Sequence, residues 1–301
     1  MEQRMTALTW GLLALLGLIW GGSFFFARIA VIEVPPLTLV FLRLSIAALA
    51  LHIYIAGRFG IYPLLRSRWR EFLVLGILNN ALPHALIFFG QTRIGAGLAS
   101  ILNATTPIWT VLIANYLTSD EKLSSAKIIG CLTGLLGTAV LIGPSVAARG
   151  DLPVWALLLP VIAAISYGFA ATYGKRFRGI APPVIAAGQM TASSLVALPL
   201  SLVMDHPWTL AIPSGNAIAA ILAIALLSTA LGYILYFRIM AVAGATNTSL
   251  VTLLVPPSAI LLGFLFLGER LETTEIAGMA LIGLGLIILD GRIYSRSRAL
   301  A

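Results

Sequence analysis

Residues 81–112 read ALPHALIFFGQTRIGAGLASILNATTPIWTVL, and residues 230–261 read ALGYILYFRIMAVAGATNTSLVTLLVPPSAIL. Aligned without gaps, the two stretches share an Ala-Leu pair at the start, a Gly-Ala pair in the middle, and a proline and a leucine near the end. Two further pieces return at nearly the same spacing: Pro35-Pro36 as Pro182-Pro183, and Glu121-Lys122-Leu123 as Glu269-Arg270-Leu271. The pattern predicts two copies of one unit, one after the other.

The composition is that of a protein embedded in lipid. Of the 301 residues, 59% are hydrophobic and only 10% are charged, whereas soluble domains carry about 25% charged residues. A soluble protein of this composition would not have enough polar side chains to cover its surface. A cytosolic enzyme, a nucleic-acid-binding protein and a secreted disulfide scaffold are therefore excluded. The net charge of +8 does not change this, because the basic residues are scattered between apolar runs.

Uncharged runs give the number of membrane spans, because a helix needs about 20 apolar residues to cross the hydrocarbon core. They cover residues 5–27, 34–57 (interrupted only by Arg43), 72–92, 94–119, 128–148, 152–174, 179–204, 206–237, 239–268 and 276–289. The eighth run is long because His206, Pro207, Pro213 and Asn216 are expected in a loop before the helix. The sequence thus predicts an all-α polytopic membrane protein with ten transmembrane helices.

Each copy of the repeat holds five spans, so the second copy must enter the membrane in the opposite direction. Such inverted repeats are typical of secondary transporters, whose substrate site lies near the midplane between the repeats. We expect a first five-helix repeat over residues 1–148, a second over 149–291, and a short basic cytoplasmic tail over 292–301.

The distribution of Lys and Arg sets the orientation, because short cytoplasmic loops are enriched in both. With the N-terminus in the cytoplasm, four basic residues fall on the outer side: Arg28, Arg93, Arg149 and Arg270. The inner side then holds Arg4, Arg58, Arg66, Arg68, Arg70, Lys122, Lys127, Lys175, Arg176, Arg178, Arg238, Arg292, Arg296 and Arg298. Both termini are therefore predicted to be cytoplasmic.

Several motifs resemble the EamA family of the drug/metabolite transporter superfamily. They are Ile19-Trp20-Gly21-Gly22-Ser23-Phe24 followed by Arg28, Pro35-Pro36 ahead of Phe41-Leu42-Arg43, Pro107 in the fourth span, and Gly268-Glu269-Arg270-Leu271 before the last. The resemblance covers roughly residues 8–291. It implies ten helices in two inverted repeats and the export or exchange of small metabolites. The stretch from Asn79 to His84, together with Gln91, is similar to YddG-type amino-acid exporters of this family.

A polar stripe runs along the third span. At 100° per residue Asn80, His84 and Gln91 lie on one helix face, and polar groups facing lipid are costly. They either hydrogen-bond neighbouring helices or line a substrate route, and the length of the stripe favours the second reading. Asn79 lies beside the stripe. The aligned stretch of the second repeat offers Thr229, Tyr233 and, one turn further, Tyr236.

Aromatic and basic residues inside spans add further candidates. Trp20, Phe24, Trp109 and Tyr167 lie deep in their spans, where ordinary packing competes with a site for an apolar or aromatic substrate side chain. Arg43 is the one basic residue within a predicted span. It either caps a neighbouring helix end or attracts a substrate carboxylate, and both readings stay open.

The leading function is the export of small metabolites by alternating access across a bacterial-type inner membrane. Amino acids, aromatic or other neutral ones, are the leading substrate class. A drug/metabolite or nucleotide-sugar transporter of the same fold and an intramembrane enzyme are the alternatives. All eleven carboxylates fall at span ends or in loops, which argues against a proton antiporter for cationic drugs.

His84 is the titrating side chain deep in a span, and hence the candidate for proton coupling; facilitated movement is favoured over it. No catalytic residue, metal or cofactor is predicted. The expected partners are a small-molecule substrate and the lipid bilayer, without nucleic acid, and the expected state is a monomer or homodimer. Gly130, Gly134, Gly137, Gly278, Gly283 and Gly285 should let the fifth and tenth spans approach closely.

Overall fold

A computed structural model describes residues 6–57, 60–117, 125–147, 152–236, 238–239, 242 and 251–290, and all regular structure within them is helical. The first half contains α1 (Ala7–Ala30), α2 (Pro36–Ile55), α3 (Ile61–Ser67), α4 (Trp69–Gly76), η1 (Ile77–Ala81), α5 (Leu82–Gln91), α6 (Ala96–Asn103), α7 (Thr106–Leu117) and α8 (Ser125–Ala147). The second contains α9 (Val154–Gly174), η2 (Lys175–Phe177), α10 (Pro182–Leu200), η3 (Ser201–Asp205), η4 (Pro207–Thr209), α11 (Gly215–Leu222), η5 (Ala223–Leu231), α13 (Val251–Leu267) and α14 (Thr273–Asp290).

Within the described residues, seven helical segments are long and apolar enough to cross a membrane. They are Ala7–Ala30, Pro36–Ile55, Trp69–Gln91, Ala96–Leu117, Val154–Phe177, Pro182–Asp205 and Gly215–Tyr236. Shorter apolar helices, Lys127–Val140, Leu254–Leu267 and Thr273–Ile288, lie where the fifth, ninth and tenth spans were expected. The all-helical membrane class is thus confirmed, while ten spans and cytoplasmic termini remain predictions.

The eighth span begins slightly earlier than the sequence suggested. Asn216 was expected in the preceding loop, but α11 starts at Gly215. The reason is local, because the Ser214 side chain accepts a hydrogen bond from the backbone N–H of Ala217 and so caps the helix.

The third and eighth spans each contain a π-helical segment at the same place in the repeat. In the third span this is η1, where the Leu82 N–H bonds the Ile77 carbonyl five residues back. Pro83 has no N–H for the Asn79 carbonyl, which favours the wider turn. In the eighth span η5 ends at Leu231, just before Gly232. Such π turns widen a helix and occur frequently at functional sites.

The fourth span is broken into two helices. Its first half, α6, ends at Asn103, and α7 begins at Thr106. Pro107 cannot bond the Asn103 carbonyl, which instead accepts a 2.7 Å hydrogen bond from the Thr106 hydroxyl. Broken helices of this kind are common near transporter binding sites.

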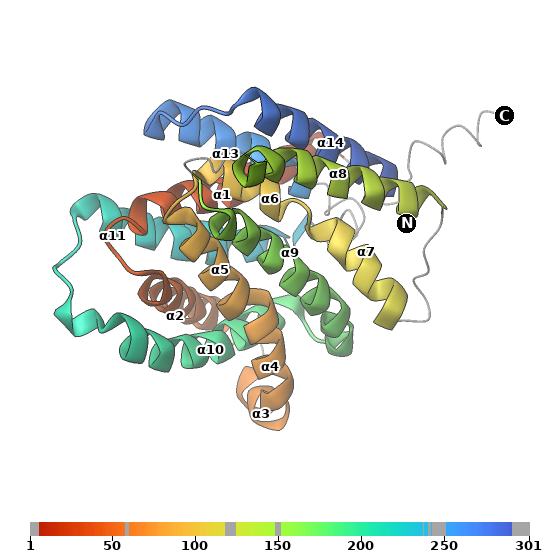
Figure 1. The fold of residues 1–301 in the computed structure, drawn as a ribbon. Helices are drawn as coiled ribbons and strands as arrows, with labels where there is room; N and C mark the ends of the chain where they lie inside the picture. The colour runs from red at the N-terminus through yellow and green to blue at the C-terminus, as the bar shows by residue number, and fades with distance from the viewer. Residues whose placement is uncertain are drawn as a thin grey trace.

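The helices pack side by side in a bundle (Figure 1). Helices α8 and α14 run antiparallel, whereas α1 and α13 run parallel, with Gly17 against Leu254 and Gly21 against Ser258. Helices α8 and α14 lie side by side on one face of the bundle, and α2 and α10 lie side by side on the other. A Cβ on Gly137 would lie 2.7 Å from the Gly278 carbonyl oxygen, and one on Gly285 would lie 2.7 Å from the Gly130 carbonyl oxygen. The expected close approach through glycines is therefore present, but a Cβ on Gly283 would meet nothing within 4 Å, so this residue lies outside the seam. Cys131 of α8 is 3% exposed.

Carboxylates at one end of the bundle hold helix N-termini from distant parts of the chain. Asp205 accepts bonds of 2.6 and 2.9 Å from the backbone N–H and hydroxyl of Thr38 in α2. Glu269 accepts from the backbone N–H groups of Ala96 and Gly97 in α6, at 2.9 and 3.2 Å. The predicted topology places all of these segments on the outer side. The carboxylates are well placed, because negative charge is favourable at a helix N-terminus.

Glu33 makes a third connection of this kind, between the α1–α2 loop and the residue that caps α11. Its two carboxylate oxygens accept 2.6 Å hydrogen bonds from the Ser214 N–H and hydroxyl. The side-chain bond from Ser214, followed by the backbone bond, lowers the pKa of Glu33 below its ordinary value. The carboxylate therefore stays charged at neutral pH.

Candidate functional site

Polar side chains from both halves of the chain meet around Arg43 in the interior of the bundle. We call this group the central polar cluster; its members are Arg43, Asn79, Asn80, His84, Tyr167, Gln189, Thr229 and Tyr233. Arg43, on α2, is only 8% exposed, and its Nε donates a 3.0 Å hydrogen bond to the Thr229 hydroxyl on η5. Tyr167 and Tyr233 lie within electrostatic reach of its guanidinium.

An aromatic ring carries this contact on to the third span. The Arg43 guanidinium carbon lies 5.8 Å from the centre of the Phe88 ring, a cation–π distance. Phe88 in turn stacks on His84, with ring centres 6.2 Å apart and an interplanar angle of 14°. One positive charge, one aromatic ring and one imidazole therefore form a continuous column.

The two repeats are joined by an amide network at the π turn. Asn79 Nδ2 donates a 2.9 Å hydrogen bond to Gln189 Oε1 on α10 and a longer one, of 3.4 Å, to the Tyr233 hydroxyl. The η1 backbone is held in place by Ser166 of α9, whose hydroxyl donates 2.7 Å to the Leu78 carbonyl. The π turn is therefore fixed by α9 and connected to α10, both in the second repeat.

Two members of the cluster are buried without full hydrogen bonding. Asn80 is 0% exposed, and neither Oδ1 nor Nδ2 has a hydrogen-bond partner in the described part of the chain. Nδ1 of His84, which is 6% exposed, also lacks one there. An unsatisfied buried polar group costs about 1–3 kcal/mol, so native proteins keep few of them, and each requires an explanation.

The charge of Arg43 is likewise uncompensated. Among the residues that the structure describes, no carboxylate forms an ion pair with it, and the carboxylates with described side chains lie in loops or near helix ends. A buried charge is costly unless it is paired, and the Phe88 ring offsets only part of that cost. The cluster therefore favours an anionic group beside Arg43.

Aromatic rings flank the cluster on the side of α1. Trp20 stacks on Tyr236, with ring centres 5.5 Å apart, and meets Tyr233 edge-on at 6.4 Å. Gly232 makes room for this arrangement, since a Cβ there would lie 2.6 Å from Trp20 Nε1. The rings offer an apolar surface next to the polar groups.

Three candidates from the sequence lie outside this network of contacts. Gln91 is 0% exposed at the end of α5, and its Nε2 donates 2.7 Å to the Phe24 carbonyl of α1. The Phe24 side chain is in the main hydrophobic core. Trp109 of α7 donates 3.2 Å to the Thr105 hydroxyl, and its backbone abuts Gly168, next to Tyr167.

Gln189 and Phe88 belong to the site, although the sequence analysis did not select them. Gln189 is an uncharged polar residue inside an apolar run, which is the same signal that identified Asn80. Phe88 carries no such signal, because a phenylalanine in an apolar run is typical of ordinary packing. Its position between Arg43 and His84 emerges only from the tertiary structure.

Comparison with known proteins agrees with this architecture. The EamA-like transporter family matches the chain twice, over residues 8–143 and 154–289. An uncharacterized transporter of Archaeoglobus fulgidus is 26% identical over 286 residues, covering 93% of this chain and 98% of its own. A probable terminal-alkyne amino-acid exporter of Streptantibioticus cattleyicolor is 27% identical, with coverage of 98% and 97%.

Two further comparisons concern the membrane and the fold. The uncharacterized inner membrane transporter YedA of Escherichia coli is 26% identical, covering 96% of this chain and 92% of its own. A protein of known crystal structure superimposes with a TM-score of 0.66 at 20% identity, covering 93% and 96% of the two chains. The chain therefore belongs to the EamA-like transporter family, as a multi-pass inner-membrane transporter and not an enzyme.

Proposed function

We propose that this transporter exports small carboxylate-bearing metabolites, with aromatic and other neutral amino acids as the leading substrate class. The observations that support this most are the buried guanidinium of Arg43, which has no carboxylate partner among the described residues, and the buried, unsatisfied amide of Asn80 on the span that carries Phe88 and His84. A site that lacks an anion and hydrogen-bonding partners is suited to a substrate that brings both.

The substrate carboxylate would bind to the guanidinium of Arg43, whose planar N–H groups suit carboxylate oxygens. Asn80 Oδ1 is a hydrogen-bond acceptor without a partner in the described chain, and it is available to a substrate ammonium group. An apolar or aromatic substrate side chain would pack against the rings of Trp20, Tyr233 and Tyr236.

Alternating access follows from the origin of the site in both repeats. Arg43 of the first repeat is hydrogen-bonded to Thr229 of the second. Asn79 of the first repeat is hydrogen-bonded to Gln189 of the second. Rocking of one repeat against the other would therefore open the cluster to one side at a time. We favour facilitated export down the substrate gradient, with His84 as the proton carrier in the coupled alternative.

A nucleotide sugar or another phosphorylated metabolite is the second candidate class. Phosphate groups favour several basic side chains in one site. Among the described residues, Arg43 is the one arginine or lysine of the central polar cluster. This charge count favours a single carboxylate over a diphosphate.

Flux into proteoliposomes tests the proposal. Labelled phenylalanine, leucine and a nucleotide sugar would be compared in the parent and in Arg43→Gln. We expect amino-acid flux in the parent and a loss of roughly 10- to 100-fold in apparent affinity in the variant, because a hydrogen bond to a charged group contributes about 1.5–3 kcal/mol.

Arg93→Gln is the matched control, because it removes an exposed arginine at a helix end and leaves the cluster intact. Unchanged amino-acid flux in Arg43→Gln would contradict the assignment of Arg43. Flux of the nucleotide sugar alone would replace the leading substrate class by the second one.

A further inference from the structure

The chain makes a sharp turn where α3 meets α4, and we call residues 61–71 the basic elbow. Helix α3 ends at Ser67, α4 begins at Trp69, and Arg68 between them is non-helical, with φ −118° and ψ 26°. The elbow projects from the end of the bundle (Figure 1). Two large aromatic side chains point outward there, with Tyr62 72% exposed and Trp69 55% exposed.

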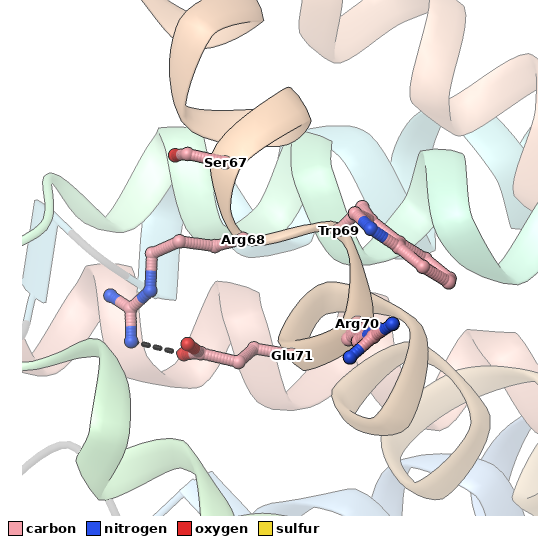
Figure 2. A pocket seen from close by; sticks show the side chains of 5 residues that line it. All are labelled: Ser67, Arg68, Trp69, Arg70 and Glu71. Carbon is pink, nitrogen blue, oxygen red and sulfur yellow. Dashed lines mark hydrogen bonds and ion pairs between the residues drawn. The ribbon is translucent and has the colours of Figure 1, made fainter.

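The surface of the elbow that faces the bundle is attached to the second repeat. Arg68 forms an ion pair with Glu71, donates 3.0 Å to the Arg176 carbonyl, and lies 4.9 Å from the centre of the Phe177 ring. Below this contact Phe72 packs on Phe177, with ring centres 4.9 Å apart. Figure 2 shows Arg68 and Glu71 turned toward each other, while Trp69 and Arg70 lie on the other side of the turn.

The surface of the elbow that faces away from the bundle carries excess positive charge. Glu71 is the only acidic residue in 56–71 and is paired with Arg68, and residues 174–181 contain no acid. Arg66 and Arg70 are exposed on the elbow, and Arg176 and Arg178 are exposed on the adjoining turn. The Arg70 guanidinium lies 5.3 Å from the centre of the Trp69 ring, so its charge is held beside an aromatic face.

Two surface hollows lie between these groups. One, of about 630 Å³, is lined by Tyr62, Pro63, Arg66 and Ser67. The other, of about 350 Å³, is lined by residues 67–71 and is the hollow drawn in Figure 2. None of the residues of the central polar cluster lines either hollow, so this surface is separate from the proposed transport site.

We propose that the basic elbow binds the headgroup of an anionic phospholipid. Arg66 and Arg70 would contact the lipid phosphate, and Tyr62 and Trp69 would lie at the level of the headgroups. The elbow joins two predicted membrane spans, so it meets the bilayer surface, where exposed tyrosine and tryptophan side chains are favoured. Basic residues next to a span attract anionic lipids, and the charge of Arg66 and Arg70 is not neutralised by Glu71.

Fluorescence of the full-length protein in lipid nanodiscs tests this. Phosphatidylcholine discs would contain brominated phosphatidylglycerol or, at the same mole fraction, brominated phosphatidylcholine as quencher. The Trp69 signal is the difference between the parent and Trp69→Phe. We expect phosphatidylglycerol to quench Trp69 more strongly, and its preference over phosphatidylcholine to fall roughly fivefold for each of Arg66→Gln and Arg70→Gln.

Two further variants serve as controls. Arg93→Gln removes an exposed arginine at a different helix end and should keep the preference. The double change Arg66→Lys with Arg70→Lys preserves the charge and should also keep it, which separates charge from misfolding. Equal quenching by both lipids in the parent would overturn the proposal, as would an unchanged preference in Arg66→Gln/Arg70→Gln. Loss of the preference on adding inorganic phosphate at constant ionic strength would overturn it in favour of a soluble anion.

Discussion

At the scale of single residues, the buried amide of Asn80 lowers the stability of the protein. The amide is buried, and in the described chain it has no hydrogen-bond partner. A purely structural asparagine in an apolar run would be bonded to a neighbour, as Asn79 is to Gln189. The contrast between these adjacent residues supports the proposal that Asn80 binds substrate while Asn79 connects the two repeats.

We therefore expect Asn80→Leu, which has similar volume, to raise stability while lowering transport. Removing an unsatisfied buried amide should stabilise the protein by about 1–3 kcal/mol, seen as a higher thermal midpoint in detergent. Substrate flux should fall in the same variant. Asn79→Leu is the comparison, and it should lower the midpoint because it leaves Gln189 without this donor. A lower midpoint in Asn80→Leu would mean that the Asn80 amide is bonded in the native protein.

Residue spacing could predict much of the site, but not its connections. A polar residue in an apolar run is the signal by which Arg43, Asn80 and His84 were selected from the sequence, and Thr229 was selected because it aligns with Asn80 in the second repeat. The hydrogen bond between Arg43 and Thr229 joins residues far apart in the chain, and periodicity within one helix contains no information about such a partner. For the same reason the insertion of Phe88 between Arg43 and His84 could not be predicted.

At the scale of helices, the seam between α8 and α14 depends on the absence of side chains. Gly137 faces the Gly278 carbonyl, and Gly285 faces the Gly130 carbonyl, so the two backbones touch. Close backbone approach through small residues is a common way for helices to associate in lipid, where no hydrophobic effect drives them together. The seam could be predicted from the sequence because both spans carry glycines, and small residues on two apolar helices allow their backbones to approach closely.

A matched pair of substitutions tests the seam. Gly285→Ala would place a Cβ 2.7 Å from the Gly130 carbonyl oxygen, and overpacking of this kind costs typically about 1–3 kcal/mol. Gly283→Ala, two residues away, would meet nothing within 4 Å, so it should be neutral or slightly stabilising. The thermal midpoints of the two variants in the same detergent should differ accordingly. Equal midpoints would show that the seam tolerates a methyl group.

The π turn of the third span is the element that sequence periodicity could not supply. A period of 100° per residue assumes an unbroken α-helix, whereas Ile77–Ala81 bonds five residues back. Pro83 is a local signal of an irregularity, but proline produces kinks, breaks and π turns alike. Which of these forms is set by the surroundings, here the hydrogen bond from Ser166 to the Leu78 carbonyl.

At the scale of the whole molecule, the inverted repeat and the basic-residue distribution make a joint prediction. An even number of spans puts both termini on one side, and the excess of arginine and lysine places that side in the cytoplasm. A cytoplasm-active reporter fused after Ala301 should therefore be active. A fusion within the predicted outer loop, at Arg93, should be inactive with the same reporter and active with a periplasm-active one. The reverse pattern would invert the assignment of the outer carboxylate contacts and of the basic elbow.

The lone cysteine gives the natural protein an experimental advantage. Cys131 is the one cysteine of the chain and is buried in α8, 3% exposed. A polar maleimide should leave it unmodified, so a cysteine introduced elsewhere would be the only labelled position, without prior removal of a native thiol. Cysteine would replace Trp20, Tyr236 or Thr229, one at a time. Labelling of that cysteine by maleimide added from either side of the membrane would then report when the position becomes accessible to water. The transport cycle can thus be followed by chemical labelling on an otherwise unaltered sequence.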